Sequence, residues 1–370
     1  MSSSRGPKFG PLPAEAASAF QIAFRRSHEV HNDCHSHDGK SDLKNMATEE
    51  KIKVLLFGLG AIGGFYAFIL SRNSNVSLSV IARSNYQAVT DNGLHIQSQN
   101  HGDHTVKFDG VYCSPSEANT KFDYIVCAHK AVNPSATPPP FKNVVSDQTT
   151  FVIIQNGVGN EEPFRTTFPK CSILSCVTWV GALQSEPGLI KHTKSEDMQI
   201  GLFPNASLDA DVEKERLDNF ASLLREGGTV FQVEDNIQVK RWEKVVWNAA
   251  WNPLTTLTMV DTHTWLESSE EAMPVTRRLM QEVVDVGRRC DVPLKDGLID
   301  ELISKILAMP GIGSSMQTDA KAGRALEVDV ILGYPMKKAR EFGMDLPVLS
   351  AIYSLTMAVN GRLTQAKRSR

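Results

Sequence analysis

The sequence predicts an α/β domain followed by an all-helical domain, and three observations lead to this prediction. From Lys51 onward, short apolar runs rich in β-branched residues alternate with helical stretches, which is typical of a parallel sheet covered by helices. Beyond about Asn236 the apolar spacing is helical throughout. The chain has 370 residues, enough for two domains with separate cores. We therefore place the first domain at residues 51–235 and the second at residues 236–370.

The first domain is predicted to open with a strand–helix–strand unit. The runs KIKVLLFG (51–58) and VSLSVIAR (76–83) are apolar, as buried parallel strands are, and a turn and a helix separate them at 59–73. Two further strands, a hairpin-rich part of the sheet, a helix and a last strand are expected, in this order, at 122–130, 149–157, 171–203, 211–228 and 229–235. In the second domain, helices are expected at 237–252, 273–290, 296–309, 324–343 and 349–363.

The composition argues against several classes of protein. Hydrophobic residues make up 41% and charged residues 22% of the chain, and the formal net charge is −3, so no strong basic field attracts nucleic acid or an anionic membrane. The six cysteines include no CxxC pair, which favours a reducing compartment over a disulfide framework. No apolar run reaches the roughly 18 residues that a membrane-spanning helix needs. We expect a cytoplasmic protein with neither a nucleic-acid nor a membrane partner.

Residues 1–50 lack a pattern that would form a core, and we predict a disordered N-terminal extension. Basic residues near its start make a mitochondrial presequence an alternative, and Met46 is an alternative start. The extension is also rich in side chains that bind transition metals, namely His28, His31, Cys34, His35 and His37. We favour a polar tail over a metal site here, and we predict no metal site elsewhere.

A glycine pattern predicts the function of the first domain. Gly58, Gly60 and Gly63 form G-x-G-x-x-G after the first strand and at the start of a helix. The first glycine permits a tight turn, the second lets the backbone approach a pyrophosphate, and the third allows close helix–strand packing. We interpret the first domain as a Rossmann-type dinucleotide-binding domain rather than one with a purely structural glycine turn. The residues expected at the cofactor are Gly58, Leu59, Gly60, Ala61, Ile62 and Gly63.

The end of the second strand bears on which dinucleotide binds. Proteins specific for NAD usually carry Asp or Glu there, to bind the ribose 2′-hydroxyl. This chain has Arg83 instead, and a guanidinium can pair with a 2′-phosphate. We therefore predict NADPH as the cofactor, the alternative being that Arg83 is a surface arginine at a strand end.

The first predicted helix of the second domain carries a line of polar residues. Lys244, Asn248 and Asn252 stand four residues apart, so they share one side of the helix, whereas most of their neighbours are apolar. Buried polar groups need partners. A ligand is one such partner, and bonding of the asparagines to neighbouring loops is the alternative. Pro253 is expected to end or kink this helix.

Two further segments contain candidate ligand-binding residues. Asn156 follows a predicted buried strand, at the sheet edge where ligands bind in such folds. Ser314 and Ser315 precede Glu327 by what we expect to be a few helical turns. Glu327 lies in an otherwise apolar stretch that we expect to be helical, and either a role at the site or simple exposure would explain it.

Taken together, the chain from about Lys51 to its end resembles the ketopantoate reductase family. The resemblance rests on five motifs in order: GLGAIGG (58–64), HK (129–130), QNGVG (155–159), KVVWNAAWNPLT (244–255) and SSMQTDAKAGRALEVD (314–329). It implies NADPH-dependent reduction of 2-dehydropantoate (ketopantoate), or a closely related branched 2-keto acid, to the 2-hydroxy acid, a step of pantothenate biosynthesis. We expect that the chain can form a homodimer.

The resemblance also implies roles for particular residues. Lys244 matches the general acid, and Glu327 matches the residue that holds a substrate hydroxyl. Lys130 matches a lysine near the cofactor, and Asn156 is expected at both the cofactor and the substrate. The residues expected to bind substrate are Asn156, Lys244, Asn248, Asn252, Ser315 and Glu327.

The chain also departs from the family pattern. After Glu327, Val330 and Leu332 stand where an aromatic residue and an asparagine are common, and Trp247 and Trp251 add bulk beside the polar line. These departures bear on which keto acid is the substrate. One alternative is therefore a reductase for another keto acid on the same scaffold. The other is a protein that binds NADPH without turnover.

Overall fold

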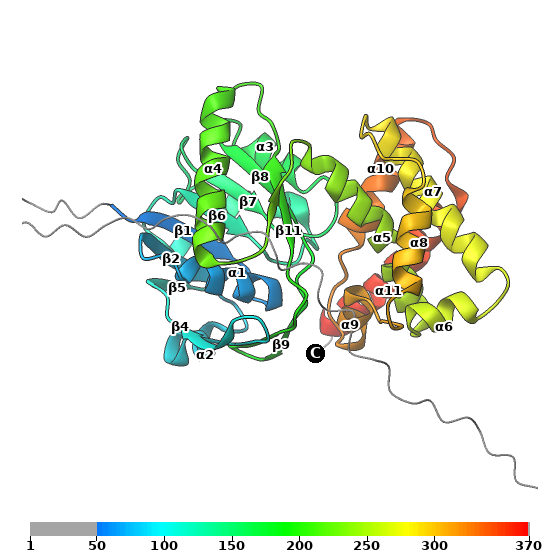
Figure 1. The fold of residues 1–370 in the computed structure, drawn as a ribbon, viewed down its shortest axis with the longest axis horizontal. Coiled ribbons are helices and arrows are strands. Elements are labelled where there is room, and N and C mark those ends of the chain that lie inside the picture. Colours follow the sequence, from blue (N-terminus) through cyan, green and yellow to red (C-terminus); the bar gives the residue numbers. More distant parts are fainter. Residues whose placement is uncertain (1–49, 369–370) are drawn as a thin grey trace, which may run out of the picture. The chain divides into compact units, whose positions relative to one another are not determined.

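An eight-stranded sheet lies at the centre of the first half of the chain (Figure 1), in the order β12-β11-β8-β7-β6-β1-β2-β5. Its strands are β1 (Ile52–Phe57), β2 (Val76–Ile81), β5 (Gly110–Tyr112), β6 (Tyr124–Cys127), β7 (Thr150–Ile153), β8 (Ser172–Thr178), β11 (Met198–Leu202) and β12 (Gln232–Val233). All neighbouring pairs are parallel except β8 and β11. The central strands β6 and β7 are buried along their whole length, which explains their continuous apolar sequence. The predicted α/β class is confirmed.

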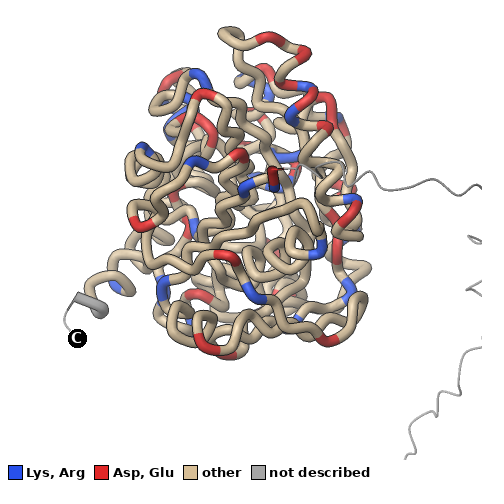
Figure 2. The backbone as a smooth tube through the Cα atoms, turned by 90° about the vertical axis from the view of Figure 1, so that its left-hand side faces the viewer, with Lys and Arg blue, Asp and Glu red and all other residues tan. Residues whose placement is uncertain are grey.

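The computed structural model describes residues 50–368. The disordered extension predicted for residues 1–50, its metal-binding alternative and Met46 therefore lie, except for Glu50, outside the described residues. No helix within residues 50–368 is long and apolar enough to cross a membrane. On the side seen in Figure 2, positions of Lys and Arg are interspersed with those of Asp and Glu, so this side shows no large field of one sign.

Helices α1 (Ala61–Ser71) and α4 (Ala210–Gly227) pack side by side against the sheet (Figure 1). A hydrogen bond of 2.7 Å from Arg72 Nη1 to the carbonyl of Gly227 joins their ends. Asp209 begins α4 by accepting from the backbone N–H of Asp211, as an N-cap residue does. The remaining helical segments of this half are α2 (Tyr86–Asn92), α3 (Glu161–Thr167) and the short turns η1 (Pro115–Glu117), η2 (Pro134–Ala136) and η3 (Pro139–Phe141).

A second sheet of four strands was not predicted. It has the order β4-β3-β10-β9, with the strands β3 (Leu94–Ser98), β4 (Gly102–Val106), β9 (Ala182–Glu186) and β10 (Leu189–His192). The hairpin-rich region predicted at 171–203 is thus divided, because β8 and β11 stay in the large sheet and the β9–β10 hairpin leaves it. Strands β3 and β4 carry many polar residues, so their short runs give little apolar signal on their own.

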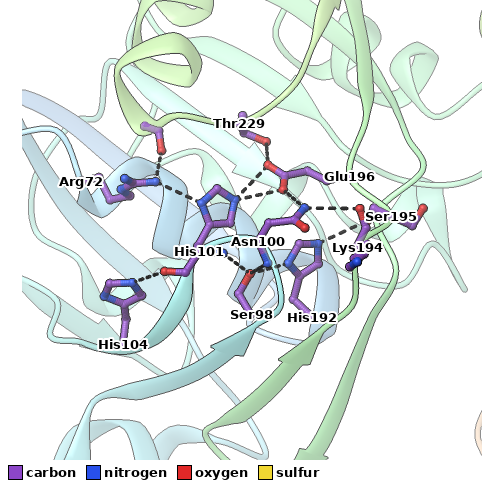
Figure 3. A network of polar contacts seen from close by, with 11 residues as sticks. Arg72, Ser98, Asn100, His101, His104, His192, Lys194, Ser195, Glu196 and Thr229 are labelled. Atoms are coloured by element: carbon purple, nitrogen blue, oxygen red, sulfur yellow. Dashed lines mark hydrogen bonds and ion pairs between the residues drawn. The ribbon is translucent and has the colours of Figure 1, made fainter. Parts of the chain in front are cut away.

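A polar network anchors the second sheet to the ends of α1 and α4 (Figure 3). The two carboxylate oxygens of Glu196 lie 3.0 and 3.1 Å from His101 Nε2, and Thr229 Oγ1 donates to Glu196 at 2.8 Å. Arg72 Nη1 lies 3.3 Å from the other ring nitrogen of His101. Beside Glu196, Ser195 Oγ donates to the carbonyl of Trp179 at 2.6 Å. The network therefore also supports the segment that carries Trp179.

The second half of the chain is helical, as predicted. Its helices are α5 (Ile237–Thr258), α6 (Thr262–Glu267), α7 (Ala272–Arg289), α8 (Leu298–Leu307), α9 (Ser315–Lys321), the π-helical turn η4 (Asp329–Gly333), α10 (Tyr334–Glu341) and α11 (Pro347–Arg368). One apolar core, built around residues of α5 and α7, joins these elements. The fold class is therefore a Rossmann-type α/β domain followed by an all-helical region.

Two local predictions in this half were wrong. The helix end predicted at Pro253 is the first: α5 continues to Thr258, because Trp251 and Leu254 on either side are buried in the core and their packing offsets the backbone hydrogen bond that proline lacks. Glu327 does not lie within a helix. Helix α9 ends at Lys321, Gly323 takes a positive φ of 64°, and helical structure resumes only at Val328.

A buried ion pair fixes the start of α5 against the carboxyl end of β7. Arg241 and Glu161 are 2% and 1% exposed, and Arg241 Nε lies 2.7 Å from Glu161 Oε1. The guanidinium also donates to the carbonyls of Ile153, Gln155 and Gly157 at 3.0, 2.9 and 2.8 Å. Because charge-assisted bonds to several acceptors hold a side chain in one geometry, they orient the polar line of α5, which begins three residues later.

Candidate active site

A cavity of about 810 Å³ collects the residues that the sequence predicted. We call it the central cavity. It is lined by the glycine turn, the ends of the strands β2, β6 and β7, one side of α5 and the start of α9. The predicted site residues that line it are Gly58, Leu59, Gly60, Ala61, Ile62, Arg83, Lys130, Asn156, Lys244, Asn248, Asn252, Ser315 and Glu327. The one predicted site residue that lies behind the cavity wall is Gly63.

The geometry of the glycine turn explains its sequence. Gly58 has a φ of +102°, and a Cβ there would lie 2.4 Å from the backbone of His129. A Cβ on Gly63 would lie 1.9 Å from the carbonyl oxygen of Gly58, so Gly63 serves close packing and not direct contact with the cavity. At Gly60 nothing lies within 4 Å of the added atom, and no side chain caps α1. The free N–H groups of the first turn and this open backbone fit a pyrophosphate.

Arg83 lies at the rim of the central cavity, at the carboxyl end of β2, with its side chain exposed. Next to it, Asn85 Nδ2 donates to the carbonyl of Leu59 at 2.5 Å and ties this strand end to the glycine turn. His129 lies on the same side of the cavity. Burial, with repulsion from Arg83 second, lowers the pKa of His129 to about 4, so this imidazole is neutral at pH 7. Arg83 is therefore the charged group here that is available to an anionic ligand.

Lys244 is held at the wall of the cavity. Its Nζ donates to the carbonyl of Thr178 at the end of β8, and it lies 5.0 Å from the ring centroid of Trp179. Desolvation lowers the pKa of Lys244 to about 7, with repulsion from Arg241 and Lys305 in the same direction and attraction by Glu327 in the opposite one. A group with this pKa exchanges its proton near neutral pH, as a general acid or base must.

The asparagine amides of α5 do not bond neighbouring loops. Asn248 and Asn252 are 6% and 4% exposed and line the cavity, yet the Nδ2 atom of each finds no hydrogen-bond acceptor among residues 50–368. A buried donor without a partner costs about 1–3 kcal/mol. Of the two explanations that the sequence allowed, the structure therefore favours a ligand.

Glu327 lines the same cavity and is 5% exposed. Its carboxylate accepts from the backbone N–H of Ala131 at 3.0 Å and from Lys130 Nζ and Asn156 Nδ2 at 3.4 Å. These donors come from the ends of β6 and β7, far away in the sequence. Glu327 is therefore one of the points where the helical half meets the strand ends, together with Arg241 and Lys244.

Asp319 is a residue of this site that sequence reasoning missed. It is 4% exposed and accepts from Lys130 Nζ at 2.8 Å and from Arg324 Nε at 2.9 Å. Desolvation alone would lower the pKa of Lys130, but Glu327 and Asp319 together hold it above its ordinary value. The available signal was spacing, because Asp319 stands one helical turn after Ser315.

The two neighbouring serines have different places. Ser314 caps α9 by accepting from the N–H of Gln317 at 3.0 Å, and it is bonded to Thr255 Oγ1 at 2.8 Å. Both serines line the cavity, but Ser315 is exposed and Ser314 is buried. Ser314 therefore serves the structure of α9, and Ser315 is the serine available to a ligand.

The comparisons with known proteins agree with this geometry. Residues 54–205 match the family model "Ketopantoate reductase PanE/ApbA", and residues 236–360 match the model of its C-terminal part. The chain belongs to the ketopantoate reductase family. Members of this family are dinucleotide-dependent oxidoreductases, and the predicted resemblance is confirmed.

Individual members of the family resemble the chain over most of its length. A 2-dehydropantoate 2-reductase from Nostoc sp. is 24% identical over 84% of this chain and 96% of its own. The crystal structure of 2-dehydropantoate 2-reductase from Methylococcus capsulatus is 30% identical, with a TM-score of 0.75 over 84% of this chain and 98% of its own. A ternary structure of D-mandelate dehydrogenase with NADH and anilino(oxo)acetate shares the fold, at 20% identity with a TM-score of 0.73 over 85% of this chain and 100% of its own.

Proposed function

We propose that this chain reduces the keto group of 2-dehydropantoate (ketopantoate), or of a closely related branched 2-keto acid, with NADPH as the reductant. The product is the 2-hydroxy acid, and the place of the reaction is pantothenate biosynthesis. The observation that carries the proposal is the position of Lys244, whose ammonium group, with a pKa of about 7, lines the same cavity as the dinucleotide turn. A cation that can give up a proton beside a bound dinucleotide suits the reduction of a carbonyl group.

The cavity residues fit the dinucleotide. The open backbone at Gly60 and the uncapped first turn of α1 are suited to the pyrophosphate, and Arg83 at the rim is suited to a 2′-phosphate. When bound, the cofactor supplies a hydride to the carbonyl carbon of the substrate. The remaining task of the protein is to hold the substrate, to exclude water and to deliver one proton.

Lys244 would deliver that proton to the carbonyl oxygen, on which negative charge develops. The carbonyl of Thr178 orients its ammonium group, and the negative charge of Glu327 partly offsets the loss of hydration that lowers its pKa. Asn248, Asn252 and Ser315 would hold the carboxylate and the distal parts of the substrate through neutral hydrogen bonds. Neutral donors hold an anion without adding a second positive charge beside the ammonium group of Lys244.

The test is NADPH oxidation by the purified protein with ketopantoate and a panel of other 2-keto acids. We expect turnover of ketopantoate or of another short, branched member. NADPH binding without oxidation across the whole panel would instead identify a protein that binds the cofactor without turnover.

A second candidate is a reductase for an aromatic 2-keto acid. Trp179, Trp247 and Trp251 all line the cavity, and edge-to-face contacts at 6.2 and 5.9 Å join them in a row. Aromatic side chains favour aromatic ligands through such contacts, and D-mandelate dehydrogenase has the same fold. Phenylglyoxylate therefore belongs in the panel, and a higher kcat/KM for it than for ketopantoate would favour this candidate.

Arg83→Ala should weaken NADPH binding about ten- to a hundredfold and leave NADH binding nearly unchanged. The reason is that a hydrogen bond to a charged group contributes about 1.5–3 kcal/mol, and only NADPH has the 2′-phosphate. Fluorescence titration with the two cofactors measures both Kd values. Equal losses for NADPH and NADH would show that Arg83 supports the strand end and not cofactor selection.

The pH dependence of reduction should follow the protonation of Lys244. Because only the ammonium form can donate a proton, kcat/KM should be constant well below pH 7, be halved near pH 7 and fall about tenfold per pH unit well above it. The charge of Glu327 raises the pKa of Lys244, so Glu327→Gln should move the midpoint of the residual activity to lower pH. An unchanged midpoint in this variant would contradict the electrostatic coupling of the two residues.

A further inference from the structure

The indole N–H of Trp251 points to a role that neither the family motifs nor the proposed function assigns. Trp251 is 2% exposed and lines the central cavity. Its Nε1 is buried and finds no acceptor within the described part of the chain. Two other tryptophans use this donor within the protein, since Trp179 Nε1 bonds Gln199 Oε1 at 3.1 Å and Trp265 Nε1 bonds Thr276 Oγ1 at 2.9 Å. A buried tryptophan normally finds such a partner, so the donor of Trp251 calls for one outside the protein.

The position of Trp251 on α5 groups this donor with two others. It stands three residues after Asn248 and one before Asn252, so all three lie within about one turn on the same side of the helix. Each has a buried N–H donor without an acceptor, and each side chain lines the cavity. Several neighbouring donors without an acceptor suit an anionic group that accepts several hydrogen bonds, as a carboxylate does.

The surroundings fix the indole and leave room for negative charge. The ring of Trp247 packs edge-to-face on Trp251, with centroids 5.9 Å apart and planes at 77°, which restricts the indole to one orientation. Lys244 precedes Asn248 by one helical turn and supplies a cation on the same side of α5. The one carboxylate that lines this cavity among the described residues, Glu327, is already paired with Lys130.

We infer that Trp251 donates its indole N–H to the carboxylate of the 2-keto acid, together with the side-chain amides of Asn248 and Asn252. Trp251 thereby determines the specificity of the site for the acid over uncharged analogues. The inference rests on the proposed function, because it names the group that receives the carboxylate of that substrate. The keto carbon is bonded directly to the carboxylate carbon, so its oxygen then lies toward Lys244.

The first test is the kinetics of Trp251→Phe, which removes the N–H and keeps an aromatic ring. Because a hydrogen bond to a charged group contributes about 1.5–3 kcal/mol, the KM for the keto acid should rise about ten- to a hundredfold, with a smaller change in kcat and an unchanged Kd for NADPH. For the methyl ester of the same acid, the change should be several times smaller. Trp251→His, which keeps a ring N–H, should recover part of the loss.

Trp265→Phe is the matched control. It also removes an indole N–H in the helical half, but that donor is bonded to Thr276 and Trp265 does not line the cavity. Its KM should equal that of the wild type. A KM for Trp251→Phe within about twofold of the wild type, or an equal rise for acid and ester, would overturn the inference.

A second measurement uses the wild-type protein and needs no turnover. The chain has five tryptophans, and ¹⁵N labelling of their indoles gives one N–H signal for each. Addition of oxamate, a dead-end analogue of a 2-keto acid, to the NADPH complex should move the Trp251 signal downfield and leave that of Trp265 in place. If oxamate binds by calorimetry and the Trp251 signal does not move, the inference fails while the proposed function stands. If the protein neither binds oxamate nor reduces any keto acid, the proposed function fails.

Discussion

Replacement of Lys244 by alanine is expected to lower kcat for keto-acid reduction at least about 10²-fold, since a positioned general acid contributes about 10²- to 10⁴-fold. The Kd for NADPH should stay nearly unchanged, because the cofactor-facing glycine turn and Arg83 are in other segments of the cavity wall. Single-turnover kinetics together with a fluorescence titration of NADPH separate the two effects. Retention of more than about a tenth of the wild-type rate would rule out this role.

Lys305 provides the control for that experiment. Its Nζ lies 4.4 Å from the centroid of the same Trp179 ring, but its side chain is exposed and does not line the central cavity. Lys305→Ala should leave kcat within about threefold of the wild type, as exposed substitutions usually do. Because Lys305 lowers the pKa of Lys244, the same variant should shift the pH midpoint slightly upward. A large loss of kcat in both variants would point to disruption of the Trp179 segment and not to loss of a proton donor.

The second large effect is expected from the substrate. Removal of the hydroxyl group from ketopantoate, as in 2-keto-3,3-dimethylbutyrate, or of its whole hydroxymethyl group, as in 2-keto-3-methylbutyrate, should lower kcat/KM by up to about 10⁴-fold, because a site built to bond a hydroxyl group strongly rejects an analogue without it. Glu327 is the acceptor that we propose for this group, and it is 5% exposed. Steady-state kinetics with the three acids test the pocket directly, and Glu327→Gln should reduce the discrimination between them.

Equal turnover of the hydroxyl-free acids would identify a broader keto-acid reductase. Not all four departures from the family pattern could then explain the broader specificity. Trp247 and Trp251 line the central cavity, whereas Val330 and Leu332 are 2% and 0% exposed and belong to the helical core. The altered specificity would thus lie with the tryptophans of α5 and not with the residues that follow Glu327.

Most of the fold could be predicted because its signals are local. The runs at β1, β2, β6 and β7 are mostly apolar, since these strands lie among neighbours in a parallel sheet. Strand β3 was missed because its residues alternate and its burial depends on pairing with β10, about ninety residues away in the sequence. Strand β4, which pairs with β3, was missed because it is largely polar and exposed. The helix end predicted at Pro253 was wrong for a related reason. The packing of α5 against other elements outweighs the local tendency of proline to end a helix.

The sequence by itself determined the parts of the site whose chemistry depends on spacing. The glycine turn needs only three positions in one loop, and the line of Lys244, Asn248 and Asn252 needs only the period of a helix. Only the tertiary structure decided which groups meet across the fold. It placed Glu327 outside a helix and against Lys130, added Asp319 to that pair, and set the pKa of Lys244 near 7. It also left the N–H of Trp251 without a partner. All of these features depend on burial and on contacts between residues that are distant in the chain. A local sequence pattern predicts neither burial nor such contacts.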